Sequence, residues 1–295
     1  MPVVESLPEQ LPPINETRRS FLIGAAAAAA GLGIYAATHA RHEIEIVRRT
    51  FPIVNLPDPF VGMRIAQISD IHLEEFTEPS FLRQVVQQVN ALEPDLVLFT
   101  GDLISRGPAP RSVALRAAGL GAEVLSELKA PQRLAILGNH DVGVNADWVV
   151  RELETHGTPV LVDSFLPLEQ KMERLFICGS DDAGTRTPDP FLAIPADPRA
   201  PVIFLVHEPD YIEIFQNHPR FPLVDIMLSG HSHGGQIRLP LVGPLVLPPM
   251  GKLYPEGLYR FDKLQLYVNR GIGTVGVPFR LNCPAEITQI TLQRA

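Results

Sequence analysis

Five apolar segments of this sequence each end in a short cluster of Asp, Asn or His residues. The clusters are Asp70-Ile71-His72, Gly101-Asp102, Gly138-Asn139-His140-Asp141, His207 and Gly230-His231-Ser232-His233. Carboxylate and amide oxygens and imidazole nitrogens bind divalent ions, and neither cysteine of the chain has the spacing of a thiolate site. The clusters together predict a centre for two metal ions, and these donors favour Mn, Fe or Zn.

The spacing inside the clusters favours chelation. Alternate residues of an extended segment share a face, so Asp70 and His72 can bind from one side, as can His231 and His233. Asp102 is a lone carboxylate after Gly101, whose missing side chain allows close backbone approach, and it suits a ligand shared by two ions. Two ions about 3.5–4 Å apart promote phosphoryl displacement by generating hydroxide and neutralising oxygen charge.

The apolar segments before the clusters predict buried strands, because they are short and rich in Val, Ile and Leu. We expect these strands at about 63–68, 96–100, 133–137, 202–206 and 225–229, with further strands near 43–47 and within 264–292. Apolar residues at helical spacing predict helices over 81–92 (N-cap Ser80), 110–128 and 146–155. Strands that alternate with helices predict a layered α/β domain, with the clusters in loops at strand ends.

Composition and charge are typical of a globular protein and argue against a nucleic-acid-binding protein. The chain has 295 residues, of which 45% are hydrophobic and 20% charged, and this is ordinary for a globular protein. Its net charge is −8 and no Lys/Arg-rich run follows residue 50, so no nucleic-acid binding is expected. Phosphate recognition would have to come from local metal charge. The Pro- and Gly-rich stretch 234–260 predicts a long loop beside the site.

The N-terminus predicts export. Residues 17–23 read Thr-Arg-Arg-Ser-Phe-Leu-Ile and precede an uncharged Ala/Gly-rich stretch, which resembles a twin-arginine (Tat) signal. The stretch 21–38 is also about long enough to span a bilayer. We therefore expect 1–41 to be a twin-arginine signal or N-terminal membrane anchor, and 42–295 to be the catalytic domain. The Tat machinery would place this domain on the periplasmic or extracytoplasmic side of the membrane. There it would be free or anchored through the N-terminal stretch.

The ordered motifs resemble those of the calcineurin-like metallophosphoesterases. The resemblance covers about 62–292. Two longer stretches, 228–240 (Leu-Ser-Gly-His-Ser-His-Gly-Gly-Gln-Ile-Arg-Leu-Pro) and 269–280 (Asn-Arg-Gly-Ile-Gly-Thr-Val-Gly-Val-Pro-Phe-Arg), look like the exported YkuE/YaeI-type phosphodiesterase branch. That branch is similar to the UDP-2,3-diacylglucosamine pyrophosphatases. The resemblance implies a four-layer α/β fold, a β-sandwich flanked by helices with the metal site in loops at the C-terminal ends of strands.

The resemblance also implies a role for each matching residue. One metal would be held by Asp70, His72, Asp102 and His233, and the other by Asp102, Asn139, His207 and His231. His140 would contact the phosphate and assist departure of the leaving oxygen. We add Arg270 as a candidate for binding a substrate phosphate.

Three functions compete at this point. The leading one is hydrolysis of phosphodiester or pyrophosphate bonds in a small-molecule or lipid substrate, by attack of a metal-bound hydroxide. The second is a lipid-linked UDP-sugar pyrophosphatase, which the apolar loop after His233 supports, whereas export argues against a cytosolic nucleotide substrate. The third is a non-catalytic scaffold, which the presence of every expected ligand and of His140 disfavours.

Overall fold

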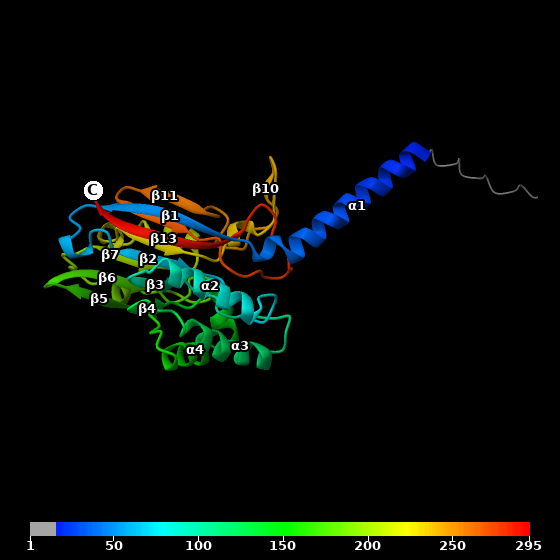
Figure 1. The fold of residues 1–295 in the computed structure, drawn as a ribbon. Coiled ribbons are helices and arrows are strands. Elements are labelled where there is room, and N and C mark those ends of the chain that lie inside the picture. The colour runs from blue at the N-terminus through cyan, green and yellow to red at the C-terminus, as the bar shows by residue number, and fades with distance from the viewer. Residues whose placement is uncertain (1–15) are drawn as a thin grey trace, which may run out of the picture.

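The structure is a computed structural model that describes residues 16–295, so the first fifteen residues of the predicted signal or anchor lie outside it. Two mixed β-sheets form the centre of the domain (Figure 1). In spatial order, the first sheet contains β1 (Ile44–Ile53), β13 (Ala285–Arg294), β2 (Arg64–Ile68), β3 (Leu96–Phe99) and β4 (Gln132–Ala135). Strands β2, β3 and β4 run parallel, whereas β13 is parallel to β1 and antiparallel to β2.

The second sheet has a parallel centre and two antiparallel edges. In spatial order, it contains β11 (Gly257–Phe261), β12 (Leu264–Val268), β8 (Ile226–Ser229), β7 (Val202–Leu205), β6 (Glu173–Gly179) and β5 (Ser164–Gln170). Strands β12, β8, β7 and β6 run parallel, and β11 and β5 pair with the edges in the antiparallel sense. A small separate hairpin is formed by β9 (Arg238–Leu239) and β10 (Gly243–Pro244).

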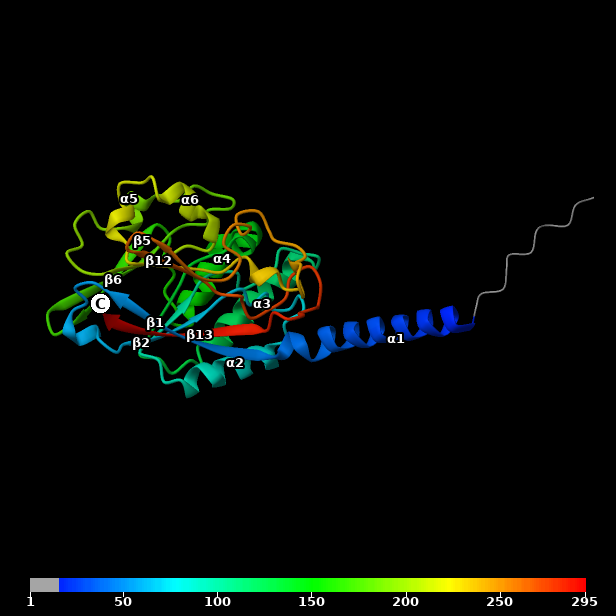
Figure 2. The same cartoon turned by 90° about the horizontal axis from the view of Figure 1, so that it is seen from above.

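Helices cover the outer faces of both sheets. The helices are α1 (Glu16–Thr38), α2 (Pro79–Ala91), α3 (Arg111–Leu125), α4 (Asn139–Thr155), α5 (Pro190–Ala193) and α6 (Ile212–Phe215). Helices α2, α3 and α4 pack on the first sheet, and the short α5 and α6 pack on the second. Helix α1 projects away from one end of the domain (Figure 2) and is long and apolar enough to cross a membrane.

Strand periodicity explains the layers. In β3, Leu96 and Leu98 enter the core between the two sheets, whereas Val97 and Phe99 face the layer of α2–α4. Because successive side chains point to opposite faces, a strand buried on both faces must be apolar at every position. Helix layer, sheet, sheet and helix layer follow one another, which confirms the predicted four-layer fold.

The predicted strands preceding the ligand clusters are all present, with ends shifted by one or two residues. The prediction that Ser80 caps the first helix of the domain is wrong. Helix α2 begins two residues earlier than predicted, with Glu78 at the N-cap and Pro79 in the first turn. Proline has no N–H to leave unpaired and its φ is already helical, so it suits that position. The segment expected as a long loop also contains the β9–β10 hairpin and the start of β11.

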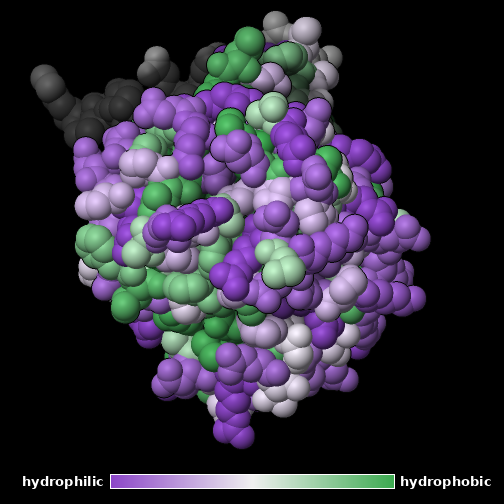
Figure 3. All heavy atoms as spheres, turned by 90° about the vertical axis from the view of Figure 1, so that its left-hand side faces the viewer, coloured by the Kyte–Doolittle hydropathy of each residue, from purple (hydrophilic) through white to green (hydrophobic). Residues whose placement is uncertain are grey.

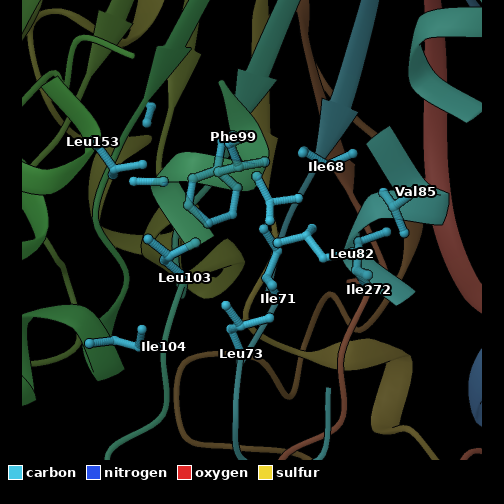
Figure 4. Close-up of a cluster of buried hydrophobic side chains, with 14 of the residues drawn as sticks. Ile68, Ile71, Leu73, Leu82, Val85, Phe99, Leu103, Ile104, Leu153 and Ile272 are labelled. Carbon is cyan, nitrogen blue, oxygen red and sulfur yellow. The ribbon is translucent and has the colours of Figure 1, made fainter. Parts of the chain in front are cut away.

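A continuous apolar core supports the ends of β2 and β3. Figure 4 shows Ile68, Phe99 and Leu103 gathered with Leu82 and Val85 of α2. Ile71 and Leu73, which flank His72, point into the same core. The loop that carries the first cluster is thus fixed by its apolar neighbours, leaving Asp70 and His72 to face the other way.

Candidate metal centre

The structure brings all seven predicted metal ligands together. Ligand atoms lie within 4.8 Å of one another in three groups: Asp70, His72 and His233; His72, Asp102 and His140; Asp102, His207 and His231. Asn139 joins the third group, because its Oδ1 lies 3.0 Å from Nδ1 of His231. The ligands come from the C-terminal ends of β2, β3 and β4 in one sheet and of β7 and β8 in the other. The centre therefore sits where the two sheets meet.

Asp102 lies between the two halves of the centre. Its Oδ2 is 3.2 Å from Nε2 of His207 and 3.6 Å from Nε2 of His72. On the side of His72, Oδ1 of Asp70 is 3.4 Å from Nε2 of His233. One carboxylate oxygen thus faces imidazoles from both predicted sites, the arrangement expected of a shared ligand.

Hydrogen bonds fix which nitrogen of two histidines can bind a metal. Nδ1 of His207 donates to the carbonyl of Thr100 at 2.7 Å, which leaves Nε2 free of a proton for a metal. Nε2 of His231 donates to the carbonyl of Pro249 at 2.7 Å, which leaves Nδ1 beside Asn139. Such carbonyl partners orient ligating imidazoles and set their tautomers.

Buried nitrogen atoms without hydrogen-bond partners test whether these residues suit a bound divalent ion. Nε2 of His207 and Nδ1 of His233 are buried and have no hydrogen-bond partner among the described residues. Buried polar atoms are normally paired, so an unpaired imidazole nitrogen facing Asp102 and Asp70 requires an explanation. A divalent ion at this position would satisfy Nε2 of His207, and the donor set fits such an ion.

Close backbone contacts hold the ligands in place. A Cβ added to Gly138 would lie 2.2 Å from Oδ1 of Asp102, and one added to Gly230 would lie 2.3 Å from Oδ2 of Asp70. Real Cβ atoms do not approach other atoms this closely, so a side chain at either glycine would displace a ligand. In the sequence, each of these glycines directly precedes another ligand, Asn139 or His231.

Asp141 is a functional residue that the sequence analysis assigned no role. Its fully buried carboxylate accepts hydrogen bonds from the backbone N–H groups of Asp102 (2.8 Å), Leu103, Ile104 and Gly138. It therefore ties the start of α4 to the loop that carries Asp102. Carboxylates in the first turn of a helix meet free N–H groups, but this signal was hidden because the helix was predicted only from 146.

His140 lies at the edge of the centre. Its ring stands edge-on to that of His72, with centroids 4.8 Å apart, and its backbone N–H donates to Oδ1 of Asp102 at 2.8 Å. Nδ1 accepts a hydrogen bond from the backbone N–H of Arg106 at 2.8 Å. A neutral ring in this arrangement carries its proton on Nε2, which makes Nε2 a donor.

The predicted phosphate ligand Arg270 lies apart from this group. Its guanidinium bonds Glu286 (2.6 Å) and Glu45 (2.8 Å), and it does not line the cavity above the metal ligands. Phosphate binding by Arg270 stays an untested prediction.

A second arginine, which the sequence analysis did not single out, is fully buried near the centre. Arg280 donates to the carbonyls of Arg270, Gly271, Gly273 and Cys283. Gly273 in turn donates its N–H to the carbonyl of Asp70 at 2.7 Å. Arg280 thus shapes the loop that supports the first ligand. The available signal was a single charge within the otherwise uncharged stretch 271–283.

A cavity of about 690 Å³ opens above the ligands. Its polar floor includes His72, Asp102, Asn139, His140, His231 and His233. Its walls are mainly apolar and come from Ile237, Leu245, Val246, Pro248, Pro249, Val275 and Val277. The cavity can therefore receive a molecule with an anionic group at one end and an apolar part at the other.

Burial keeps several of the imidazoles neutral, which is the protonation state that binds metal. Burial lowers the pKa of His72 to about 3 and that of His231 to about 4, so both are neutral at physiological pH. Burial alone would also lower the pKa of His207, but Asp102 and Asp70 hold it well above its ordinary value. Burial raises the pKa of Asp70 to about 6. Burial and the charge of Asp102 raise the pKa of the neighbouring Asp141 further, to about 7. In the metal-free protein, His207 therefore holds a proton at physiological pH, whereas Asp70 gains one only below about pH 6.

Comparisons with known proteins agree with this arrangement. The family profile of calcineurin-like phosphoesterases matches residues 63–235. The metallophosphoesterase YkuE of Bacillus subtilis is 36% identical, over 94% of this chain and 98% of its own length. The phosphodiesterase YaeI of Escherichia coli is 30% identical, over 80% and 84% of the two chains. The UDP-2,3-diacylglucosamine pyrophosphatase LpxG of Chlamydia muridarum is 31% identical, over 74% and 81%.

The role of Asp141 can be tested with Asp141→Asn. Burial raises the pKa of Asp141 to about 7, so the carboxylate is mostly charged at pH 8. At that pH the amide keeps the shape but loses the negative charge and places an NH₂ group among N–H donors, so we expect weaker Mn²⁺ binding and a loss of about 1–3 kcal/mol of stability. Isothermal titration calorimetry and urea unfolding measure the two effects. Asp147→Asn, on the exposed side of α4, is the control and should change neither. Unchanged metal affinity in Asp141→Asn would contradict the positioning role.

Metal loading should depend on pH in a defined direction. Asp70 is protonated below about pH 6 and His207 is protonated in the metal-free protein, so Mn²⁺ must displace both protons. Lowering the pH through about 6 should therefore weaken Mn²⁺ binding and increase the number of protons released per ion. Calorimetry in buffers of different ionisation enthalpy counts these protons. An affinity independent of pH across this range would show that Mn²⁺ displaces no proton from Asp70 or His207.

Proposed function

This chain belongs to the calcineurin-like phosphoesterase family, hydrolyses phosphoester bonds and uses divalent metal, and from this premise we propose that it is a dinuclear phosphodiesterase or pyrophosphatase. The observation that carries the proposal is the position of Asp102. Its Oδ2 faces His207 on one side and His72 on the other, as a ligand common to two ions would.

The proposed ligand sets divide the cluster in two. Asp70, His72, Asp102 and His233 would hold one ion, and Asp102, Asn139, His207 and His231 would hold the other. The contacts of Asp70 with His233, and of Asn139 with His231, support this division. Two divalent ions supply Lewis acidity towards the phosphate oxygens and a nucleophile at neutral pH. The absence of sulfur from both sets favours Mn, Fe or Zn.

His140 is the proposed catalytic group of the chain itself. The hydrogen bond from Arg106 N–H occupies Nδ1, so Nε2–H is free to donate into the cavity that His140 lines. Donation to the leaving oxygen stabilises the negative charge that develops as the phosphoester bond breaks. The edge-on contact with His72 and the backbone bond to Asp102 keep the ring beside the reacting group.

The proposed substrate is amphiphilic. The relative LpxG is named for a pyrophosphatase reaction on a diacylated UDP-sugar, and the present cavity combines a metal-binding floor with an apolar wall. Ile237, Val275 and Val277 of that wall would contact the apolar part of the molecule. A lipid-linked UDP-sugar is therefore the second candidate substrate, beside a simple phosphodiester.

The proposed location is the extracytoplasmic face of the membrane, after export by the Tat machinery, with α1 retained as an anchor. Ala36 and Ala40, at the junction where a signal peptidase would cut, are buried against the domain. The backbone N–H of Arg280 donates to the carbonyl of Ala36 at 3.3 Å. A protease would have to pull this segment off the folded domain before cutting it.

The first experiment is hydrolysis of bis-p-nitrophenyl phosphate by the full chain in detergent, reconstituted with Mn²⁺. Metal-dependent turnover that disappears in Asn139→Ala supports the phosphodiesterase assignment. Turnover of a diacylated UDP-sugar alone supports the second candidate. Absence of bound metal by elemental analysis after reconstitution would refute both.

Asp102→Ala should abolish turnover and lower the number of bound ions, because it removes the one carboxylate that faces both halves of the centre. Elemental analysis and the bis-p-nitrophenyl phosphate assay measure the two effects. Asp147→Ala, on the exposed face of α4, is the matched control. If Asp102→Ala kept two ions and substantial activity, the shared-ligand assignment would fail.

His140→Ala should retain metal but slow turnover by about 10²–10⁴-fold, the usual contribution of a positioned proton donor. The matched control is His156→Ala, at the other end of α4, whose Nδ1 bonds only the carbonyl of Glu152 in its own helix. Loss of metal from His140→Ala would instead identify His140 as a ligand.

A further inference from the structure

The β9–β10 hairpin has an unusual composition for a surface turn. From Leu239 to Gly251 the sequence contains no charged or hydrogen-bonding side chain. Hairpin turns in water usually carry Gly, Asn or Asp, which tolerate the backbone conformation and bind water. Here the turn between the strands consists of Pro240, Leu241 and Val242.

The tip of this hairpin is uncovered. Leu241 is fully exposed and Val242 is 69% exposed, and Val246 behind them is 76% exposed. Leu241 also has φ = +67°, a conformation that is uncommon for any residue with a side chain and is usually left to glycine or asparagine. A leucine in this strained and exposed place contributes nothing to the core. Its apolar side chain is available for contact with something outside the domain.

The base of the hairpin belongs to the cavity. Ile237, just before β9, and Leu245 and Val246, just after β10, line the wall above the metal ligands. The N–H of Leu245 donates to the carbonyl of Ile237 at 3.0 Å, which closes the hairpin at the cavity rim. The apolar surface is therefore continuous from the exposed tip to the inside of the cavity.

The hairpin and helix α1 lie at the same end of the domain (Figure 1). Helix α1 is largely exposed, and it is long and apolar enough to cross a membrane. Its C-terminal end is attached to the domain through Ala36, and Arg41 and His42 bond Glu78 directly after it. The opposite end of the domain, which faces the viewer in Figure 3, is mostly hydrophilic. A bilayer that contained α1 would lie next to the hairpin end.

We propose that the hairpin, Leu239–Val246, docks on a lipid bilayer through its tip. The Leu241 and Val242 side chains enter the interface between headgroups and acyl chains, where exposed apolar side chains are stabilised. Docking turns the cavity mouth towards the membrane, so an amphiphilic molecule can pass from the lipid along the apolar wall to the metal ligands. The docking itself does not depend on the proposed function, because it involves no catalytic group.

The test uses the full chain reconstituted in vesicles of phosphatidylcholine and phosphatidylglycerol. Leu241→Cys carries an environment-sensitive fluorophore, and Met172→Cys serves as the matched control. Met172 is also a fully exposed apolar residue, in the β5–β6 turn, which Figure 1 places at the end opposite α1. Both native cysteines are buried, so labelling is directed to the introduced thiol.

The expected result is a blue shift of the probe at position 241 and quenching of its fluorescence by lipids that carry a nitroxide on the acyl chain. The probe at position 172 should show neither. Equal behaviour of the two probes would overturn the proposal. A blue shift without quenching by lipid, or one that depends on protein concentration, would also overturn it, because a second copy or another protein would then cover the tip.

A second variant separates docking from folding and catalysis. Leu241→Asp/Val242→Asp changes only residues outside the cavity lining. We expect this variant to hydrolyse bis-p-nitrophenyl phosphate at the wild-type rate in detergent, while a probe at position 246 (Val246→Cys) loses its quenching by lipid in vesicles. Retained quenching would show that the tip does not carry docking. If no chain hydrolyses the soluble ester, the proposed function fails but the fluorescence result stands.

Discussion

Close backbone packing at the ends of the strands is the constraint on which the site depends. Gly138, after β4, stands against Asp102 after the neighbouring β3 of the same sheet, and Gly230, after β8 of the second sheet, stands against Asp70 after β2 of the first. Each ligand therefore sits beside the backbone of a different strand end. The arrangement explains why Gly-ligand pairs recur in this sequence: the glycine admits the carboxylate of one cluster, and the next residue supplies a ligand of another.

The same packing imposes strain on the ligands themselves. Asp70, His72, Asp102, His231 and His233 all have positive φ, between 49° and 69°. Such conformations cost energy for residues with side chains, and they persist only where the surroundings determine them. Here the backbone N–H groups of Ile71 and His72 both donate to the carbonyl of Asp102, and Asp141 binds the N–H of Asp102. The loops after β2 and β3 thus hold each other in the strained form.

The ligand clusters could be predicted from sequence because each follows a short apolar run that is buried on both faces. The length of the apolar run and its content of Val, Ile and Leu were sufficient to predict β2, β3, β7 and β8. The β5–β6 hairpin was missed, since Pro167 interrupts β5 and several of its side chains are exposed. A proline is acceptable there only because β5 is an edge strand, which a single sequence does not reveal.

The start of α4 and the two arginines show where sequence reasoning fails. The helix was expected only over 146–155, from the spacing of its apolar residues. Gly143 and Asn145 before it are poor helix formers, and the backbone does leave helical geometry at Asn145. The earlier turn forms because the carboxylate of Asp141 gathers N–H groups from two segments. The start of α4 thus depends on a contact between segments that are distant in the sequence. The roles of the two arginines depend on such contacts too, because Arg270 pairs with Glu286 and Arg280 is buried.

These contacts also connect the end of the domain that carries α1 to the metal centre. Strand β1 begins shortly after α1 and pairs with β13 along its whole length. Glu45 of β1 and Glu286 of β13 bind opposite parts of the Arg270 guanidinium, and the following loop donates from Gly273 to Asp70. Because each link is a short contact within the sheet or its adjoining loop, the end of α1 has a fixed position relative to the metal ligands. If α1 is an anchor, as proposed, the direction in which the cavity opens from the membrane follows from these contacts and needs no separate domain movement.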